Sequence, residues 1–279
     1  MLPLSRAVLV IAHPGHELRV HGWVETVRPS VWVLTDGSGR SQCSRIDSTT
    51  RIIAAAGANA GPIYGDLTDT QLYAAVLDLN HQQFIQIVDM LADDLVRDEV
   101  EYVVGDAAEG YNPAHDICRL IINAAVTIAR CKSKRTIGNY EFSLVGADSG
   151  YHFETGAMSL NLDNESLNRK LYALGHYPEL RAEVEAALNG GGSVGLQQHP
   201  ELARRAGFQT RTEHNLRREI LRPVNRNGGR SQNGNGTRPF YEEYGETRVA
   251  AGHYRRVLRY REHVMPLASA LDRHVERKN

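Results

Sequence analysis

The sequence lacks an excess of charge of either sign. Its 279 residues hold 32 Lys and Arg against 33 Asp and Glu, which gives a formal net charge of −1. Such a chain has no overall positive field to attract DNA, RNA or an anionic membrane surface. We therefore expect no nucleic-acid partner and a small molecule as the substrate. Nothing in the sequence indicates the oligomeric state.

Cysteine is scarce as well, and long apolar runs are missing. Cys43, Cys118 and Cys131 are odd in number and have no paired spacing, which indicates free thiols and predicts a cytoplasmic location. No apolar stretch approaches the ~20 residues that a membrane helix needs, so no membrane span is expected. The apolar run near the N-terminus has no small-residue cleavage site after it, which favours a strand over a signal peptide.

Apolar strands alternate with amphipathic helices over the first half of the chain. Runs rich in Val, Ile and Leu, typical of parallel strands buried on both faces, fall at 7–12, 31–35 and 101–105, with a shorter one at 61–65. Helical patterns fall between and after them, at 17–28, 46–58, 82–97 and about 113–131. This alternation predicts an α/β fold, a Rossmann-like three-layer sandwich with a mostly parallel sheet. Ligands of such folds bind beyond the carboxyl ends of the strands.

The pattern changes beyond about residue 150, and we expect a single domain, 1–279, with a core over about 1–150 and a C-terminal α/β elaboration. A strand at 141–147, a short helix at 178–188 and a basic amphipathic helix at 247–271 are predicted. The loop 225–239 has too little apolar content to fold by itself, so we expect it to be flexible. It is either a surface loop or a lid over a site.

Two histidines stand where the first strand gives way to a helix. In IAHPGHE, residues 11–17, His13 and His16 flank a Pro-Gly pair that lets the backbone turn tightly. His115 lies just inside the helix after the strand 101–105, so all three side chains should face the same edge of the sheet. Three imidazoles with an open position are typical of catalytic zinc sites. We predict that these histidines bind Zn²⁺ or another divalent metal.

With these residues in place, the chain resembles the PIG-L (LmbE-like) family of zinc-dependent N-deacetylases. Family members carry AHPDDE after the first strand and a motif close to HPDH at the start of a later helix. Here these motifs read AHPGHE (12–17) and NPAH (112–115). The resemblance implies a hydrolase that removes an acyl group from an N-acyl amino-sugar or a related small amide. Glu17 matches the family's glutamate, which we expect to orient a metal ligand rather than react.

Three positions depart from the family pattern. His16 stands where the family has an aspartate ligand, which keeps a metal ligand but removes a negative charge. The family's catalytic base, an aspartate, falls on Gly15, and Asn112 replaces a histidine that would help polarise the scissile carbonyl. An amide can still donate a hydrogen bond to an oxyanion, so Asn112 is expected in that role.

The proton of the attacking water must go to another carboxylate. We expect Glu109 or Asp116 to take it, and Glu109 is preferred because Asp116 also suits the first turn of a helix. Asp106 and Asp36 are further candidates.

The loss of the family's base leaves other functions open. One is a non-catalytic relative that uses the fold and the metal to bind a carbohydrate or a protein partner. Another is a redox metal at the same histidines, since neutral imidazoles suit several ions. The variant Gly15→Asp would distinguish a non-catalytic relative from a deacetylase. It should restore deacetylation if the pocket still binds a family-type substrate, and should have no effect if the pocket has been remade. Arg51, Arg222 and Arg238 could meet an anionic substrate, but each is expected to be a surface or structural arginine.

Overall fold

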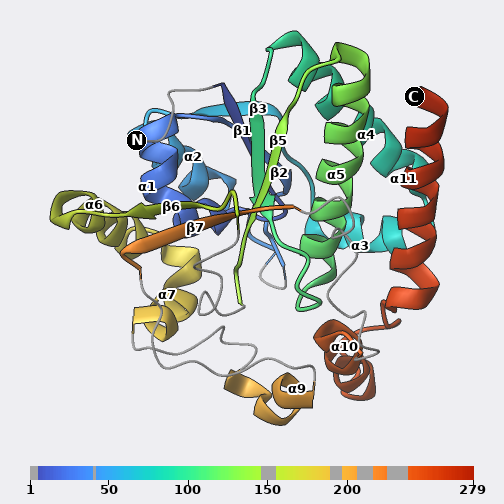
Figure 1. The fold of residues 1–279 in the computed structure, drawn as a ribbon. Helices are drawn as coiled ribbons and strands as arrows, with labels where there is room; N and C mark the ends of the chain where they lie inside the picture. The colour runs from blue at the N-terminus through green and yellow to red at the C-terminus, as the bar shows by residue number, and fades with distance from the viewer. Residues whose placement is uncertain (1–5, 40–41, 146–154, 189–196, 206–215, 225–237) are drawn as a thin grey trace.

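One mixed sheet forms the centre of the protein. The computed structural model describes residues 6–39, 42–145, 155–188, 197–205, 216–224 and 238–279 (Figure 1). The strand order is β3-β2-β1-β4-β5-β7-β6. The first five strands along the chain run parallel, whereas β7 is antiparallel to both of its neighbours. The strands are β1 (Ala7–Ile11), β2 (Ser30–Thr35), β3 (Asn59–Leu67), β4 (Tyr102–Asp106), β5 (Gly138–Phe142), β6 (Met158–Asn161) and β7 (Arg218–Pro223).

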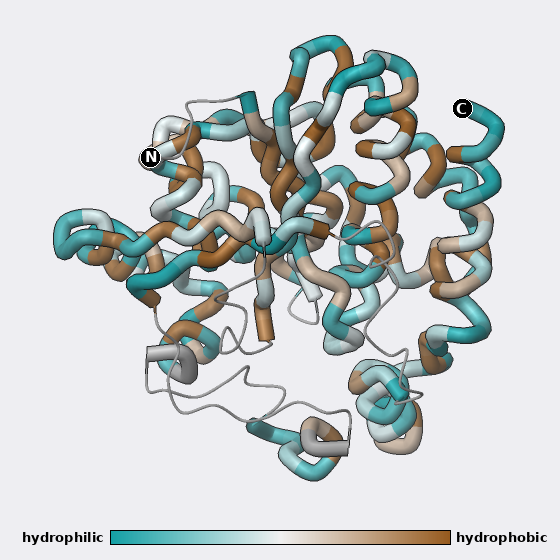
Figure 2. Tube along the Cα trace, viewed as in Figure 1, coloured by the Kyte–Doolittle hydropathy of each residue, from teal (hydrophilic) through white to brown (hydrophobic). Residues whose placement is uncertain are grey.

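Helices cover both faces of this sheet, which confirms the predicted α/β sandwich with a mostly parallel sheet. Because side chains alternate along a strand, Val8 and Val10 of β1 enter one apolar layer while Leu9 and Ile11 enter the other. Figure 2 shows these hydrophobic segments gathered between the sheet and its helices. One layer contains α3 (Asp69–Leu77), α4 (His81–Arg97), α5 (Pro113–Ser133) and α11 (Met265–Lys278), and the other contains α1 (His21–Val27) and α2 (Ile46–Ala55).

The C-terminal part differs in detail from the prediction. The expected helix 247–271 is wrong as one element: α10 (Phe240–Ala250) ends before Gly252, whose φ of +74° leaves the helical region, and helix resumes at η4 (Tyr260–Val264). The strand expected at 141–147 begins and ends earlier, as β5. Most of the loop expected at 225–239 lies outside the described residues. The other elements are η1 (His16–Val20), α6 (Asn164–Gly175), η2 (Pro178–Leu180), α7 (Arg181–Leu188) and α9 (Pro200–Arg205).

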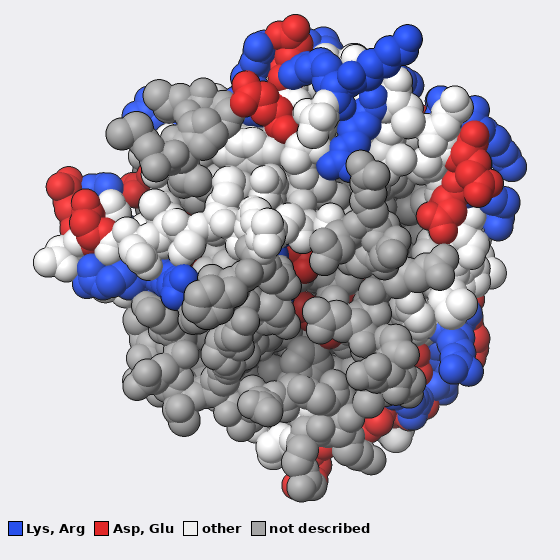
Figure 3. All heavy atoms as spheres, viewed as in Figure 1, with Lys and Arg blue, Asp and Glu red and all other residues white. Residues whose placement is uncertain are grey.

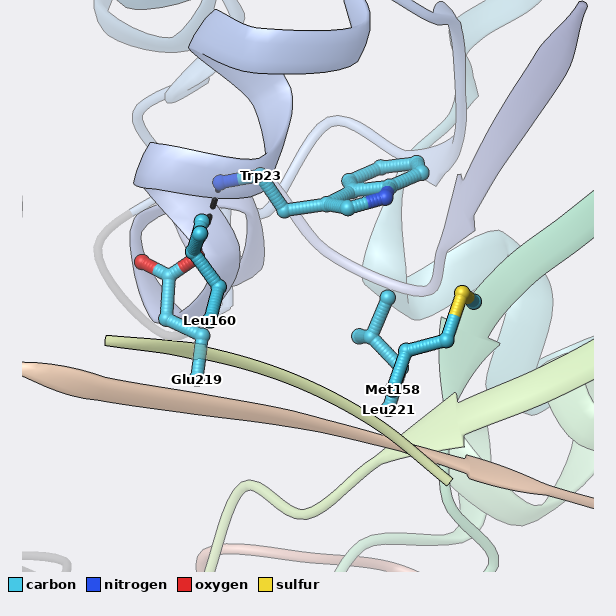
Figure 4. A pocket seen from close by; sticks show the side chains of 5 residues that line it. All are labelled: Trp23, Met158, Leu160, Glu219 and Leu221. Atoms are coloured by element: carbon cyan, nitrogen blue, oxygen red, sulfur yellow. Dashed lines mark hydrogen bonds between the residues drawn. The ribbon is translucent and has the colours of Figure 1, made fainter. Parts of the chain in front are cut away.

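A buried ion pair ties the C-terminal part to the first helix. The Glu219 carboxylate of β7 lies 2.7 Å from Lys170 Nζ, and both side chains are 1% exposed. It also accepts hydrogen bonds from the backbone N–H groups of Gly22 and Trp23, which have no partner inside α1 because they begin it. Figure 4 shows Glu219 and Trp23 lining a small pocket together with Met158, Leu160 and Leu221.

The surface carries charge of both signs. On the face drawn in Figure 3, acidic and basic side chains lie side by side over α6 and α11, as the near-zero net charge predicts. Within the described ranges, no helix is long and apolar enough to cross a membrane.

Candidate functional site

Three histidines meet at the carboxyl ends of β1 and β4. These two strands are neighbours in the sheet. β2 and β3 extend the sheet on one side of β1, and β4 and β5 extend it on the other. His13 and His16 follow β1, and His115 lies in the first turn of α5, which follows β4. The ring centroids are 5.3 Å apart for His13 and His16, 5.5 Å for His13 and His115, and 4.7 Å for His16 and His115. This edge is where ligands of open α/β sheets bind.

Two of the three rings have a buried carboxylate next to their Nδ1 atom. The Nδ1 atom of His13 lies 2.8 Å from Thr35 Oγ1 and 3.0 Å from Asp69 Oδ1. The Nδ1 atom of His16 lies 2.9 Å from Asp106 Oδ2. Burial raises the pKa of Asp69, but hydrogen bonding to His13 and the charge of that ring outweigh burial and hold the pKa below its usual range. Hydrogen bonds through Nδ1 fix how each ring is turned and leave Nε2 available.

Two other nitrogens of these rings lack a hydrogen-bond partner within the described ranges. His13 Nε2 and His115 Nδ1 are buried and have no hydrogen-bond partner among the described residues. Burial lowers the pKa of His16, and burial followed by the charges of the other two histidines lowers the pKa of His115 well below 6.5. Burial therefore favours the neutral imidazole at His16 and His115, the form that binds metals. As the side chains stand, no three His, Cys, Asp or Glu residues in the described ranges form a metal site.

The turn between the first two histidines is closed around Gly15. Its φ of +103° lies in the left-handed region, and its N–H points at both Glu17 Oε2 (2.7 Å) and Thr49 Oγ1 (3.1 Å). Thr49 also donates to Glu17 Oε1 at 2.8 Å. Glu17 is 1% exposed, and burial raises its pKa to about 7. A β-carbon at position 15 would collide with Leu180 Cδ1, so the side chain that the family carries there would require Leu180 to move.

The two carboxylates expected as bases differ in their surroundings. Glu109 accepts hydrogen bonds from the Ser143 hydroxyl (2.5 Å) and from the N–H groups of Leu144 (2.9 Å) and Val145 (3.1 Å). It therefore holds the chain that follows β5. Asp116 is 2% exposed and accepts from Gly110 N–H through Oδ1, while its Oδ2 has no partner in the described ranges. Burial raises the pKa of Asp116 to about 7.

Asn112 caps the helix that carries His115. Its Oδ1 accepts hydrogen bonds from Ala114 N–H (2.9 Å) and from the Tyr73 hydroxyl (3.0 Å). α5 begins at Pro113, as the sequence predicts. Because the side-chain oxygen is occupied, the amide nitrogen is the group that can donate to a ligand.

Arg45 belongs to the surroundings of the histidines and was not predicted from the sequence. Its positive charge acts on both His16 and His115, and its Nε donates to the carbonyl oxygen of Gly37 at 2.6 Å. Among the described residues it has no carboxylate partner. The arginines considered from the sequence are instead engaged by protein groups: Arg51 with Ser48, Arg222 with Glu141, and Arg238 with Glu242 and Glu246.

Local signals were also present for two acids beside the histidines: Asp69, which the sequence analysis missed, and Asp106, which it considered only as a base. Asp69 follows Thr68, and Thr68 and Gln71 form a capping box that starts α3, a helix that we did not predict. Asp106 is the last residue of β4, the position from which side chains reach a ligand crevice.

Comparison with known proteins gives structural neighbours alone. No family model matches the chain, and the search of curated proteins gave no match. The pseudoaglycone deacetylase of the antimicrobial reagent A40926 is 15% identical, with a TM-score of 0.49 over 79% of this chain and 97% of that one. A deacetylase of teicoplanin biosynthesis, solved as a complex, is 15% identical with a TM-score of 0.46 over 80% of this chain and 100% of that one.

The zinc-inhibited form of teicoplanin deacetylase is 13% identical, with a TM-score of 0.42 over 80% of this chain and 100% of that one. At such identities and TM-scores below 0.5, the likeness shows neither a shared family nor a shared activity.

Proposed function

We propose that this chain is a metal-dependent hydrolase that removes an acyl group from an N-acyl amino-sugar or a related small amide. The observation that carries the proposal is the meeting of His13, His16 and His115 at the carboxyl edge of the sheet. Their motifs, AHPGHE and NPAH, resemble those of the PIG-L deacetylases. None of the three cysteines, all of them within the described ranges, forms a disulfide, which supports a cytoplasmic location.

The residues present fit a divalent metal, with zinc as the leading candidate. Buried imidazole nitrogens without a partner are costly in a protein unless a ligand satisfies them, and His13 and His115 each have one. His16 completes the set, with its ring oriented by Asp106. A zinc ion bound by these histidines would act as a Lewis acid on the acyl carbonyl and make water a stronger nucleophile at neutral pH.

The chain's own groups would supply the proton transfers and the oxyanion contact. Asp116 is the better supported base, because its Oδ2 accepts no hydrogen bond from the described residues, whereas both oxygens of Glu109 are engaged. The amide nitrogen of Asn112 would donate to the developing oxyanion. Arg45 has donors that no carboxylate of the described residues occupies, which suits the hydroxyl groups of a sugar.

The deciding experiment measures metal content and amide hydrolysis on the same untagged protein. We expect about one zinc per chain by elemental mass spectrometry, and release of free amine from one or more members of a panel of N-acyl amino-sugars. His115→Ala should lose both, while His253→Ala, a change at an exposed histidine, should keep both. Absence of metal after reconstitution, or full activity in the His115→Ala variant, would refute the proposal.

A second function is favoured by the closed turn at Gly15. Since Leu180 fills the space of a side chain there, the pocket differs from that of a deacetylase with the family's base. The alternative is a metal-holding protein that binds a carbohydrate or a partner without hydrolysis. One zinc per chain and saturable binding of an N-acyl amino-sugar, with no amine released, would identify it. Iron in place of zinc would point to redox chemistry.

A further inference from the structure

His16 stands where the resembled family has an acidic metal ligand, and a buried acid lies directly behind it. Asp106 is completely buried, and its Oδ2 and Oδ1 atoms lie 2.9 Å and 3.1 Å from His16 Nδ1. The same carboxylate accepts the N–H of Ala12 at 2.8 Å, which fixes it against the end of β1. Asp106 therefore contacts the outer nitrogen of the ring and leaves the opposite nitrogen for a ligand.

The Asp106 carboxylate has no ion pair with Lys or Arg among the described residues. Arg119 is fully buried next to it, but its Nε donates to the main-chain carbonyl of Asp106 at 2.7 Å, and its guanidinium lies 3.8 Å from Glu141. Placing a carboxylate in the protein interior costs free energy unless hydrogen bonds and an opposite charge compensate it. A cation on the far side of the His16 ring would supply that charge.

The first histidine also has a carboxylate beside it, although the hydrogen bond of its Nδ1 is to Thr35 Oγ1 at 2.8 Å. His13 Nδ1 lies 3.0 Å from Asp69 Oδ1, and the side chain of Asp69 is 7% exposed. His115 has no carboxylate at its Nδ1, which is without a partner in the described ranges. Two buried carboxylates thus lie behind two of the three rings, and their combined charge would balance that of one divalent cation.

We propose that Asp106 is a positioning residue that allows a histidine to replace the acidic ligand at position 16. It would turn the ring through Nδ1–H, and it would place behind the ring the negative charge that the family carries in the ligand itself. Together with Asp69 it would match the charge of a divalent metal. This inference rests on the proposed function for the identity of the metal, but the turned ring is a property of the metal-free protein.

The proposal makes His16 and Asp106 interdependent. His16→Asp alone would put two carboxylates into one buried space, where like charges repel strongly. Asp106→Asn would remove the charge but keep an amide oxygen that can accept a hydrogen bond from the ring. The double variant, His16→Asp with Asp106→Asn, would return one negative charge to the site, now in the ligand position.

The first measurement is zinc affinity, by competition with a chromophoric chelator, for the wild type, both single variants and the double variant. Loss of a group that orients a ligand typically weakens metal binding by about 10–100-fold. We expect Asp106→Asn to fall in that range, His16→Asp to bind at least as weakly, and the double variant to recover to within about 10-fold of the wild type. Asp47→Asn, an exposed acid of α2, is the matched control and should bind normally. Additive losses in the double variant would overturn the proposal.

The second measurement separates this inference from the proposed function. Nitrogen-15 NMR of the imidazoles in metal-free protein reports which ring nitrogen carries the proton. We expect the Nδ1–H form of His16 in the wild type and loss of that preference in Asp106→Ala, which has no acceptor at this position, whereas Asp47→Ala should match the wild type. An Nε2–H form in the wild type, or no change in Asp106→Ala, would overturn the inference. A wild type that binds no zinc but shows the Nδ1–H form would refute only the proposed metal.

Discussion

A β-carbon on Gly15 would lie 2.2 Å from Cδ1 of Leu180, although the two residues are far apart in the chain. Leu180 belongs to η2 of the C-terminal elaboration, and it packs over the turn that joins the first two histidines of the site. Gly15 also has a φ of +103°, which residues with a β-carbon rarely adopt. A side chain at the position of the family's base would therefore need both a strained backbone and a displaced Leu180.

The first prediction follows for Gly15→Asp, the change that would restore the family motif. We expect it to lower the free energy of unfolding by at least about 2 kcal/mol, because left-handed backbone costs about 1–2 kcal/mol and overpacking about 1–3 kcal/mol. We expect no gain of activity. Urea denaturation would measure the loss, and adding Leu180→Ala should recover only the packing part. Gly175→Ala, where nothing lies within 4 Å of the new atom, is the control, and a Gly15→Asp protein as stable as the wild type would contradict the prediction.

The second prediction concerns metal and stability. A metal that binds the folded state alone raises the free energy of unfolding, by about 2.7 kcal/mol at a free concentration 100 times the Kd. We expect added zinc to raise the melting temperature of the wild type and a chelator to reverse the rise. His115→Ala should not respond, because one of the three imidazoles is gone. An equal shift in both proteins would show that zinc binds elsewhere.

The third prediction separates the two candidate bases. Asp116→Asn should lower kcat by about 10²–10⁴-fold, the usual contribution of a general base, and should leave the fold intact because an amide oxygen can still accept from Gly110. Glu109→Gln should lower the melting temperature instead, because it weakens three hydrogen bonds to residues 143–145. The reverse outcome, with the larger loss of kcat in Glu109→Gln, would assign the base to Glu109.

The fourth prediction concerns pH and lies away from the histidine cluster. Burial lowers the pKa of His21 from 6.5, with smaller effects from the charges of Glu25, Glu219, Lys170 and Arg169. The unfolded chain therefore binds a proton before the folded chain does. The stability that neutral His21 contributes is complete above pH 6.5 and is lost as the pH falls below it, by up to about 1.4 kcal/mol per pH unit.

Urea denaturation between pH 5 and pH 8 would test this effect. His21→Gln removes the titrating group, so its free energy of unfolding should fall less steeply below pH 6.5 than that of the wild type. His253→Gln changes an exposed histidine and should follow the wild-type curve. Identical slopes for the wild type and His21→Gln would show that His21 does not contribute.

Much of the fold was determined by local pattern. The apolar runs that became β1, β2 and β4, and the periodic helices α4 and α5, needed only the spacing of hydrophobic residues and, for α5, the Pro113 start. The short helix α3 was missed, and the helix predicted over 247–271 is interrupted at Gly252. The spacing of hydrophobic residues does not reveal a single residue with left-handed backbone, such as Gly252, although such a residue ends a helix.

The sequence by itself also determined that three histidines would face one crevice, because His13, His16 and His115 follow strands whose carboxyl ends share an edge. Only the tertiary structure decided what surrounds them. Asp106 reaches His16 because β4 pairs with β1, and Leu180 closes the turn at Gly15 because η2 packs against it. Such contacts depend on which strands are neighbours and on how helices pack against them. Neither strand order nor helix packing can be derived from a local pattern, because both bring together residues that are distant in the chain.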